Sequence, residues 1–201
     1  MRRWGLEEEV REVKKLEMTT KQWVKITPEG VEVSGEPLTT AGRGAALLTE
    51  VYRAKVNDYP KFFKMDELSK LGFLATELLL QAEGDRHSES DDRAVILFGR
   101  CGSLACDRKY QQTIERLDDF FPSPSIFVYT LPNIVTGEIA IRNHYYGETA
   151  FYAMAHCDEQ LMRQTIEASL LDPATQSVIC GWVDCESDHQ FEANVKLIYK
   201  E

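Results

Sequence analysis

Residues 129–157 read YTLPNIVTGEIAIRNHYYGETAFYAMAHC, and the pattern of this stretch decides which fold the sequence predicts. Residues 131–142 favour a helix. Pro132 fits this prediction, because it stands near the start of the stretch and proline is tolerated in the first helical turn. Residues 149–155 (TAFYAMA) are typical of a short strand. Residues 158–171 then carry apolar side chains at helical spacing. We therefore expect a helix, a strand and a second helix in succession.

The flanking sequence continues this alternation of strands and helices. Residues 93–99 (RAVILFG) form an unbroken apolar run, the pattern of a strand that is covered on both faces. Helical spacing precedes it in residues 65–81 and follows it in residues 102–117, up to the break at FFPSPS. Strands are expected again at residues 177–183 (SVICGWV) and 194–200 (NVKLIYK). The alternation predicts a layered α/β domain.

The region before these elements has weaker patterns. Residues 22–33 place β-branched residues and a tryptophan around the turn Pro28-Glu29-Gly30, which predicts a hairpin. Residues 35–44 are rich in glycine, proline and threonine and predict a loop, and residues 45–56 predict a helix. We expect one domain from Met18 to the end of the chain, residues 18–201, after a helical appendage of residues 1–17.

The composition excludes several classes of protein. A net charge of −10 and a pI near 5.0 argue against binding to nucleic acid, which needs a concentrated basic surface. The longest apolar run, residues 71–82, is too short for a bilayer and contains Glu77, so no membrane association is expected. The N-terminus lacks the apolar stretch of a secretory signal, and the five cysteines suit reduced thiols, so we expect a cytoplasmic protein.

Several stretches, taken in order, resemble the N-terminal half of the β-ketoacyl synthases, a family of the thiolase-like superfamily, over residues 60–201. The most specific one opens with Ser-Pro-Ser, continues with Leu-Pro-Asn at the start of a helix, and has Gly-Glu-Ile-Ala-Ile-Arg inside that helix. The stretches are 63–72 (FKMDELSKLG), 94–102, 123–147, and the strand pair 177–183 and 194–200. The resemblance implies half of a thiolase-like fold, a mixed β-sheet of about five strands packed with helices.

The resemblance also implies a function. Family condensing enzymes take two histidines, or a histidine and an asparagine, from a second half that has no counterpart here. We therefore expect a truncated β-ketoacyl-synthase-like protein of fatty-acid or polyketide-type biosynthesis, an accessory or non-condensing subunit. The expected partners are an acyl carrier protein, a full-length ketosynthase, or both. A homodimer is also expected, through antiparallel pairing of residues 149–155 with Phe151 and Met154 at the contact.

The position of the family's nucleophile leaves two readings open. The family usually places its cysteine nine residues after Gly147, where this sequence has His156, and Cys157 follows. Either one inserted residue preserves Cys157 as the nucleophile, or the chemistry is lost. A helix N-terminus and a protonated His156 would lower the pKa of the thiol, whereas Asp158 and Glu159 oppose the thiolate. Both His156 and Cys157 are kept as candidate catalytic residues.

Two other functions remain as alternatives. A Cys157-dependent acyltransferase or thioesterase would need fewer catalytic groups than condensation. An interaction protein could have kept only the fold, because a fold does not fix a function. We expect no cofactor and no metal, since Cys180, Cys185 and His189 lack a matching fourth ligand. The remaining histidines, His87 and His144, lie outside any family motif.

The helix expected after Cys157 would lie between two sheets in the complete family fold, and should then be apolar nearly all round. Its sequence is polar on one side, which favours a half-fold without the second sheet. Its expected apolar side consists of Leu161, Met162, Ile166, Leu170 and Leu171.

Overall fold

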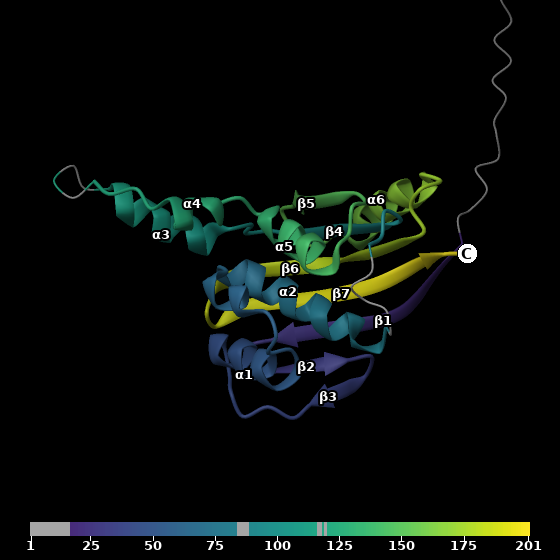
Figure 1. Ribbon diagram of the computed structural model, residues 1–201, viewed down its shortest axis with the longest axis horizontal. Coiled ribbons are helices and arrows are strands. Elements are labelled where there is room, and N and C mark those ends of the chain that lie inside the picture. The colour runs from purple at the N-terminus through teal and green to yellow at the C-terminus, as the bar shows by residue number, and fades with distance from the viewer. Residues whose placement is uncertain (1–16, 84–88, 116–117, 119) are drawn as a thin grey trace, which may run out of the picture.

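The computed structural model describes residues 17–83, 89–115, 118 and 120–201 (Figure 1). The expected N-terminal appendage, apart from Glu17, lies outside the described residues, and so does His87. None of the helices in the described ranges is both long enough and apolar enough to cross a bilayer.

A single mixed sheet forms the centre of the molecule, with the strand order β3-β2-β1-β7-β6-β4-β5. Strand β4 runs parallel to β5 and β6, and the other neighbours are antiparallel. The strands are β1 (Met18–Thr27), β2 (Gly30–Val33), β3 (Glu36–Leu38), β4 (Arg93–Gly99), β5 (Thr149–Ala153), β6 (Ser177–Ser187) and β7 (Gln190–Lys200).

The predicted α/β class is confirmed, but the sheet has seven strands rather than about five. Strands β1 and β2 form the hairpin predicted at residues 22–33, and β3, which was not predicted, follows β2 through a tight turn. The loop predicted at residues 35–44 therefore contains a strand. Strands β6 and β7 are also longer than predicted and are joined directly through Asp188 and His189.

The helices lie close to their predicted positions, and one short helix, α4, was not predicted. Short 3-10 turns cover Pro60–Lys64 and Leu80–Ala82. The α-helices are α1 (Ala45–Lys55), α2 (Glu67–Leu79), α3 (Leu104–Ile114), α4 (Pro124–Val128), α5 (Ile134–Asn143) and α6 (Glu159–Leu171).

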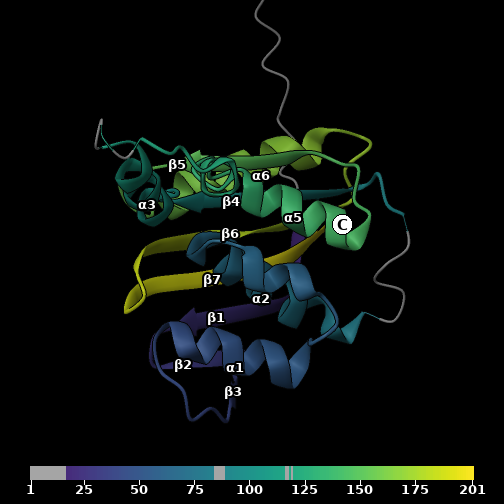
Figure 2. The same cartoon turned by 60° about the vertical axis from the view of Figure 1, so that its left-hand side comes forward.

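Helices α1, α2 and α5 cover one face of the sheet, and α6 lies on the other face (Figures 1 and 2). Helix α2 is the centre of the larger core, because it packs on β1, β6 and β7 and also under α5. Gly72 permits the contact with α5, since a Cβ at this position would lie 2.5 Å from Cγ2 of Val135. Asp66 is the N-cap residue of α2, and its side chain accepts a hydrogen bond from the backbone N–H of Ser69.

The smaller core lies between α6 and strands β4 and β6. Ile166 and Leu170 supply the buried side of α6. The apolar side that the sequence predicted for α6 is wider than the side that is buried in the structure. The prediction is wrong for Leu161, which is 48% exposed, and for Leu171, which is 61% exposed. These two leucines flank the line through Met162, Ile166 and Leu170, whose spacing of four residues keeps them on one face.

Helices α3 and α4, with the described residues among 101–115, 118 and 120–131, form an arm that extends beyond the sheet (Figure 1). The arm leaves the body beside β4 and β5, away from β1, β2 and β3 (Figures 1 and 2). Cys106 is the one side chain of α3 that is fully buried, and α4 has none. The arm therefore has little core of its own.

Candidate functional site

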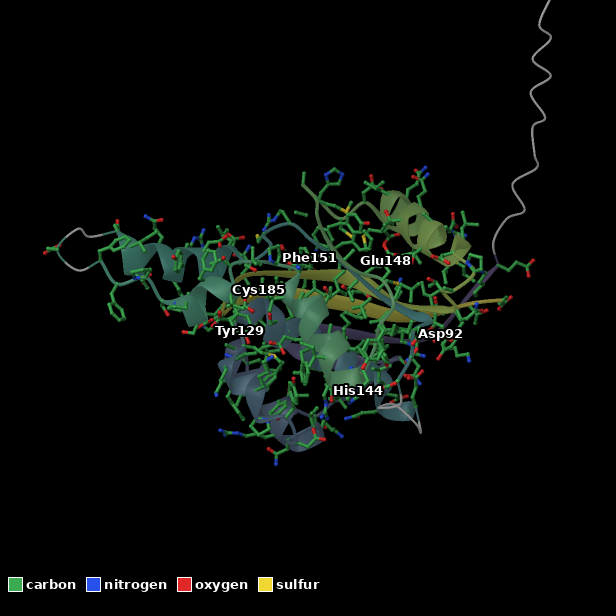
Figure 3. The ribbon with its side chains drawn as sticks, turned by 45° about the horizontal axis from the view of Figure 1, so that its top comes forward. Asp92, Tyr129, His144, Glu148, Phe151 and Cys185 are labelled. Atoms are coloured by element: carbon green, nitrogen blue, oxygen red, sulfur yellow. The ribbon has the colours of Figure 1, made fainter. Side chains whose placement is uncertain are left out.

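The carboxyl ends of β4, β5 and β6 meet at one end of the sheet, where the loops that follow them surround a hollow of about 520 Å³. Loops at the carboxyl ends of parallel strands are common positions for binding sites. The lining of this hollow includes Arg100, His156, Cys157, Asp184 and His189. Figure 3 shows Cys185, near this end of β6, far from Asp92, which precedes β4 at the other end.

Cys157 and His156 lie in the loop between β5 and α6, and both are exposed. Asp158 is the N-cap residue of α6. Its Oδ1 accepts hydrogen bonds from the backbone N–H groups of Gln160 at 3.1 Å and Leu161 at 3.0 Å. Cys157 thus stands one residue before the helix, and its carboxylate neighbour already occupies these two helix-terminal donors.

The surroundings of Cys157 disfavour its thiolate. Burial raises the pKa of this thiol most, and the negative charges of Glu159, Glu192 and Asp158 raise it further. Lys196 acts in the opposite direction and does not compensate. Because a thiol reacts as its thiolate, the raised pKa makes Cys157 a weaker nucleophile at neutral pH.

Asp184 fixes the loop after β4. Its Oδ1 accepts the backbone N–H groups of Arg100 at 2.9 Å and Cys101 at 2.7 Å. The guanidinium of Arg100 lies 3.6 Å from Oδ2 of Asp184, and its Nη2 donates to Oε2 of Glu186 at 2.9 Å. These backbone donors are therefore engaged by a side chain and do not form a ready oxyanion site.

His189 lines the same hollow from the turn between β6 and β7. This turn is held against the start of α1, where the N–H of Ala45 donates to the carbonyl of Asp188 at 2.9 Å. Gly44 has a positive φ of 59°, and a Cβ there would lie 2.7 Å from Nδ1 of His189. Only glycine suits both this backbone conformation and this close approach.

The structure brings the two candidate catalytic residues together. Cys157 and His156 line one hollow, and His189, which was not predicted as a site residue, lines it as well. His144 ends α5, and its carbonyl accepts the N–H of Ser90, which places it at the opposite, amino end of β4.

The cysteines of β6 cannot share a metal ion with one another. Cys180 and Cys185 are separated by an odd number of positions, so they point to opposite faces of the sheet. Cys180 belongs to the core under α6 and Cys185 to the core under α2, and burial raises the pKa of each thiol to about 12. Across the described ranges, no group of three or more His, Cys, Asp or Glu side chains is placed to hold a metal.

The sequence reading missed Arg100, Asp184 and Glu186 as members of the site. One signal was present, because Asp184 interrupts the otherwise apolar run SVICGWV-D-C. A carboxylate in such a run needs a partner when it is buried, and this one is 9% exposed.

No family model matches this sequence, and no curated protein matches it either. Solved structures do match. The ishigamide ketosynthase/chain length factor is 17% identical with a TM-score of 0.66, over 90% of this chain and 62% of that one. A ketosynthase in complex with its chain length factor from Xenorhabdus doucetiae is 16% identical with a TM-score of 0.56, over 92% and 79%. A β-ketoacyl synthase from Burkholderia phymatum is 11% identical with a TM-score of 0.60, over 92% and 59%.

These similarities confirm the predicted fold. The described chain has the α/β architecture of the thiolase-like ketosynthases. It spans 62% of the ishigamide protein's chain and 59% of the Burkholderia chain, so the similarity covers part of those molecules.

Proposed function

We propose that this chain, which has the fold of the β-ketoacyl synthases, is a non-condensing subunit that pairs with a complete ketosynthase in fatty-acid or polyketide-type biosynthesis. The observation that carries this proposal is the open edge of the sheet at β5, beside the exposed apolar arm.

The two edges of the sheet differ in how they are protected. The edge strand β3 has only three residues and contains Glu36 and Pro37, which discourage pairing with another chain. The edge strand β5 (TAFYA) has no charge and no proline, and Tyr152 is 41% exposed. An unprotected edge of this kind suits the addition of a strand from a partner.

The arm adds an apolar surface on the same side of the molecule. Monomeric proteins rarely expose large apolar side chains in a continuous group. The base of the arm is anchored, because the hydroxyl of Tyr129 donates to Oε1 of Glu138 at 3.2 Å and Lys61 pairs with Oε2 at 2.8 Å. The exposed group consists of Phe120, Phe121, Phe127, Val128 and Leu131.

The candidate site supports a subunit that does not condense acyl chains by itself. The thiol of Cys157 has a raised pKa, and Asp158 and Asp184 occupy nearby backbone donors. Decarboxylative condensation needs an activated nucleophile and free donors around the acyl oxygen.

The matched structures support a pairing role. Two of them contain a ketosynthase with a chain length factor, and another similar structure is a type II polyketide-synthase acyl-carrier protein in complex with its ketosynthase. An acyl carrier protein is therefore a further partner in this proposal. A homodimer through β5 is the form expected when no other ketosynthase subunit is present.

Co-expression with the complete ketosynthases of the same organism, followed by light scattering on the purified product, tests this function. We expect a stable pair. A chain that remains a monomer alone and with every ketosynthase would overturn the proposal.

Two variants locate the interface. The N–H of Met154 donates to Gly99 of β4, so the alternate N–H groups of Phe151 and Ala153 point away from β4. Ala153→Pro removes one outward donor and keeps the bonds to β4, and we expect it to weaken pairing at least tenfold, as Phe127→Asp should in the arm. Phe63→Asp is the control, because Phe63 is 49% exposed at a distant helical turn.

Incubation of the purified chain with acyl thioesters, followed by mass spectrometry, distinguishes the acyltransferase and thioesterase alternative. The proposed subunit should carry no adduct on Cys157. An adduct that disappears in Cys157→Ala would favour the enzyme in which Cys157 and His156 react.

A further inference from the structure

A second hollow, of about 350 Å³, lies beside α6 on the face of the sheet that α2 does not cover. It exists because one helix covers only about two strands, since strands lie about 4.8 Å apart and a helix is about 10 Å wide. Helix α6 packs mainly on β4 and β6, so that in the described ranges no helix covers most of β7 and β1 on this face, although Ile198 of β7 belongs to the core under α6. We call this hollow the α6 groove.

The floor of the α6 groove consists of cross-strand rows of side chains. In one row Val178, Ile198 and Thr20 are paired across β6, β7 and β1. In the next row Lys196 stands between Cys180 and Trp23. Residues paired in this way lie side by side on one face of a sheet.

Apolar side chains form the wall and much of the floor. Met162 and Ile166 of α6 face Ile198 and Trp182 of the sheet across the groove. A volume of about 350 Å³ is within the range of about 300–1,000 Å³ that is usual for small-molecule sites.

Lys196 is the unusual feature of this groove, because it is a cation with no ion pair in the part of the chain that the structure describes. The other charged groups of the lining do not neutralise it. Arg163 pairs with Glu167 at 2.7 Å, and Glu159 lines the groove without reaching ion-pair distance of Lys196. A lone cation beside apolar walls suits a ligand with one negative charge and an apolar tail.

Trp182 gives a second indication of a ligand. It is 7% exposed, and its Nε1 has no acceptor among the described residues. A buried donor without an acceptor is costly, so an oxygen atom from a ligand beside Trp182 would stabilise the site.

We propose that the α6 groove binds a medium-chain carboxylate. The carboxylate lies at Lys196, with the amide of Asn194 on the neighbouring floor position, and the alkyl chain packs against Met162, Ile166 and Ile198. This site is on a different face from the β5 edge and does not depend on the proposed pairing function.

Titration with decanoate below its micelle concentration tests the site, with tryptophan fluorescence as the signal because Trp23 and Trp182 flank Lys196 and the groove. We expect saturable binding that weakens about tenfold in Lys196→Met. Lys64→Met is the matched control, since Lys64 is exposed in the 3-10 turn Pro60–Lys64 and does not line the groove. Decanol, which has the same tail and no charge, should also bind about tenfold more weakly.

Alkylation of Cys157 gives an independent signal, because this thiol lines the groove and is exposed. Saturating decanoate should slow its alkylation several-fold in the wild type, and the same concentration should slow it much less in Lys196→Met. Each rate is compared with that of the same variant without decanoate, because Lys196 itself lowers the pKa of this thiol. Absence of saturable binding, or equal affinity in Lys196→Met and the wild type, would overturn the proposal. Because Lys196 is an exposed strand residue, its replacement should leave the thermal unfolding curve unchanged, which verifies that the variant is folded.

Discussion

At the scale of single residues, the charges beside Cys157 determine how readily its thiol ionises. The carboxylate of Asp158 caps the N-terminus of α6, and the negative charge of Glu159 in the first turn interacts favourably with the helix dipole. The same charges raise the pKa of the thiol beside them, after the larger effect of burial. Good helix initiation and an activated nucleophile therefore conflict at this position.

Glu159→Gln tests this conflict directly. We expect the pKa of Cys157 to fall, because Glu159 is the largest charge effect on this thiol, and its alkylation at neutral pH to become faster. Asp158 still begins the helix in this variant, so stability should change by less than about 0.5 kcal/mol. The measurement is the alkylation rate as a function of pH. Glu167→Gln, farther along α6, is the control, and equal rates in the two variants would contradict the prediction.

Glu50 controls the loop before α1 in a pH-dependent way. Its carboxylate accepts the backbone N–H groups of Ala41 and Gly42, which lowers its pKa below the usual value of 4.5. A lowered pKa stabilises the fold above pH 4.5, and this contribution is lost as the pH falls through the lowered value. In Glu50→Gln, we expect the slope of unfolding midpoint against pH to be smaller below pH 4.5, as measured by thermal unfolding. An unchanged slope would be inconsistent with this role.

The residues of the site were only partly predictable. His156 and Cys157 are adjacent in the sequence, and the motif before them gives their place at the end of a strand. The contact of Arg100 with Asp184 and Glu186 joins two strands that are far apart in the sequence. Their pairing depends on the sheet order, which local patterns do not specify.

At the scale of elements, prediction succeeded where one physical pattern dominated. Strand β4 is an unbroken apolar run covered on both faces, and its predicted bounds match the structure. Strand β3 and helix α4 were missed because elements of three and five residues are too short to show a period. The outer extent of β6 was missed because Asp184 and Glu186 are polar residues whose partner comes from another strand.

The contact between α2 and α5 gives a prediction with an internal control. Gly72→Ala should destabilise the protein by about 1–3 kcal/mol, because the new methyl group would overlap Val135 in a packed core. Gly137→Ala, in the interior of α5, has open space around its Cβ position and should stabilise the protein by up to about 1 kcal/mol. Denaturant unfolding measures both. Similar effects of the two substitutions would show that helix propensity, not packing, decides the result.

At the scale of the whole molecule, the arm and the body have different relations to solvent. The body buries a large core under α2, whereas the arm exposes Phe121 to 80% and Phe120 to 58%. Side chains that contribute little to the core of the chain itself are available for a contact with another chain.

Replacing Phe120 and Phe121 together by serine should therefore separate association from stability. We expect the unfolding free energy of the isolated chain to stay within about 0.5 kcal/mol, because the replaced side chains are exposed. Association with a partner should weaken by at least tenfold. A large loss of stability would show instead that the arm packs on the body through these two residues.

The unequal edges of the sheet also limit the size of any assembly. A sheet with two open edges can add molecules at both sides and grow into a filament. Here β3, with Glu36 and Pro37, closes one end of the strand order, and β5 leaves the other end available. If molecules pair through the sheet as proposed, growth is expected to stop at two members, because the three residues of β3 block the other edge.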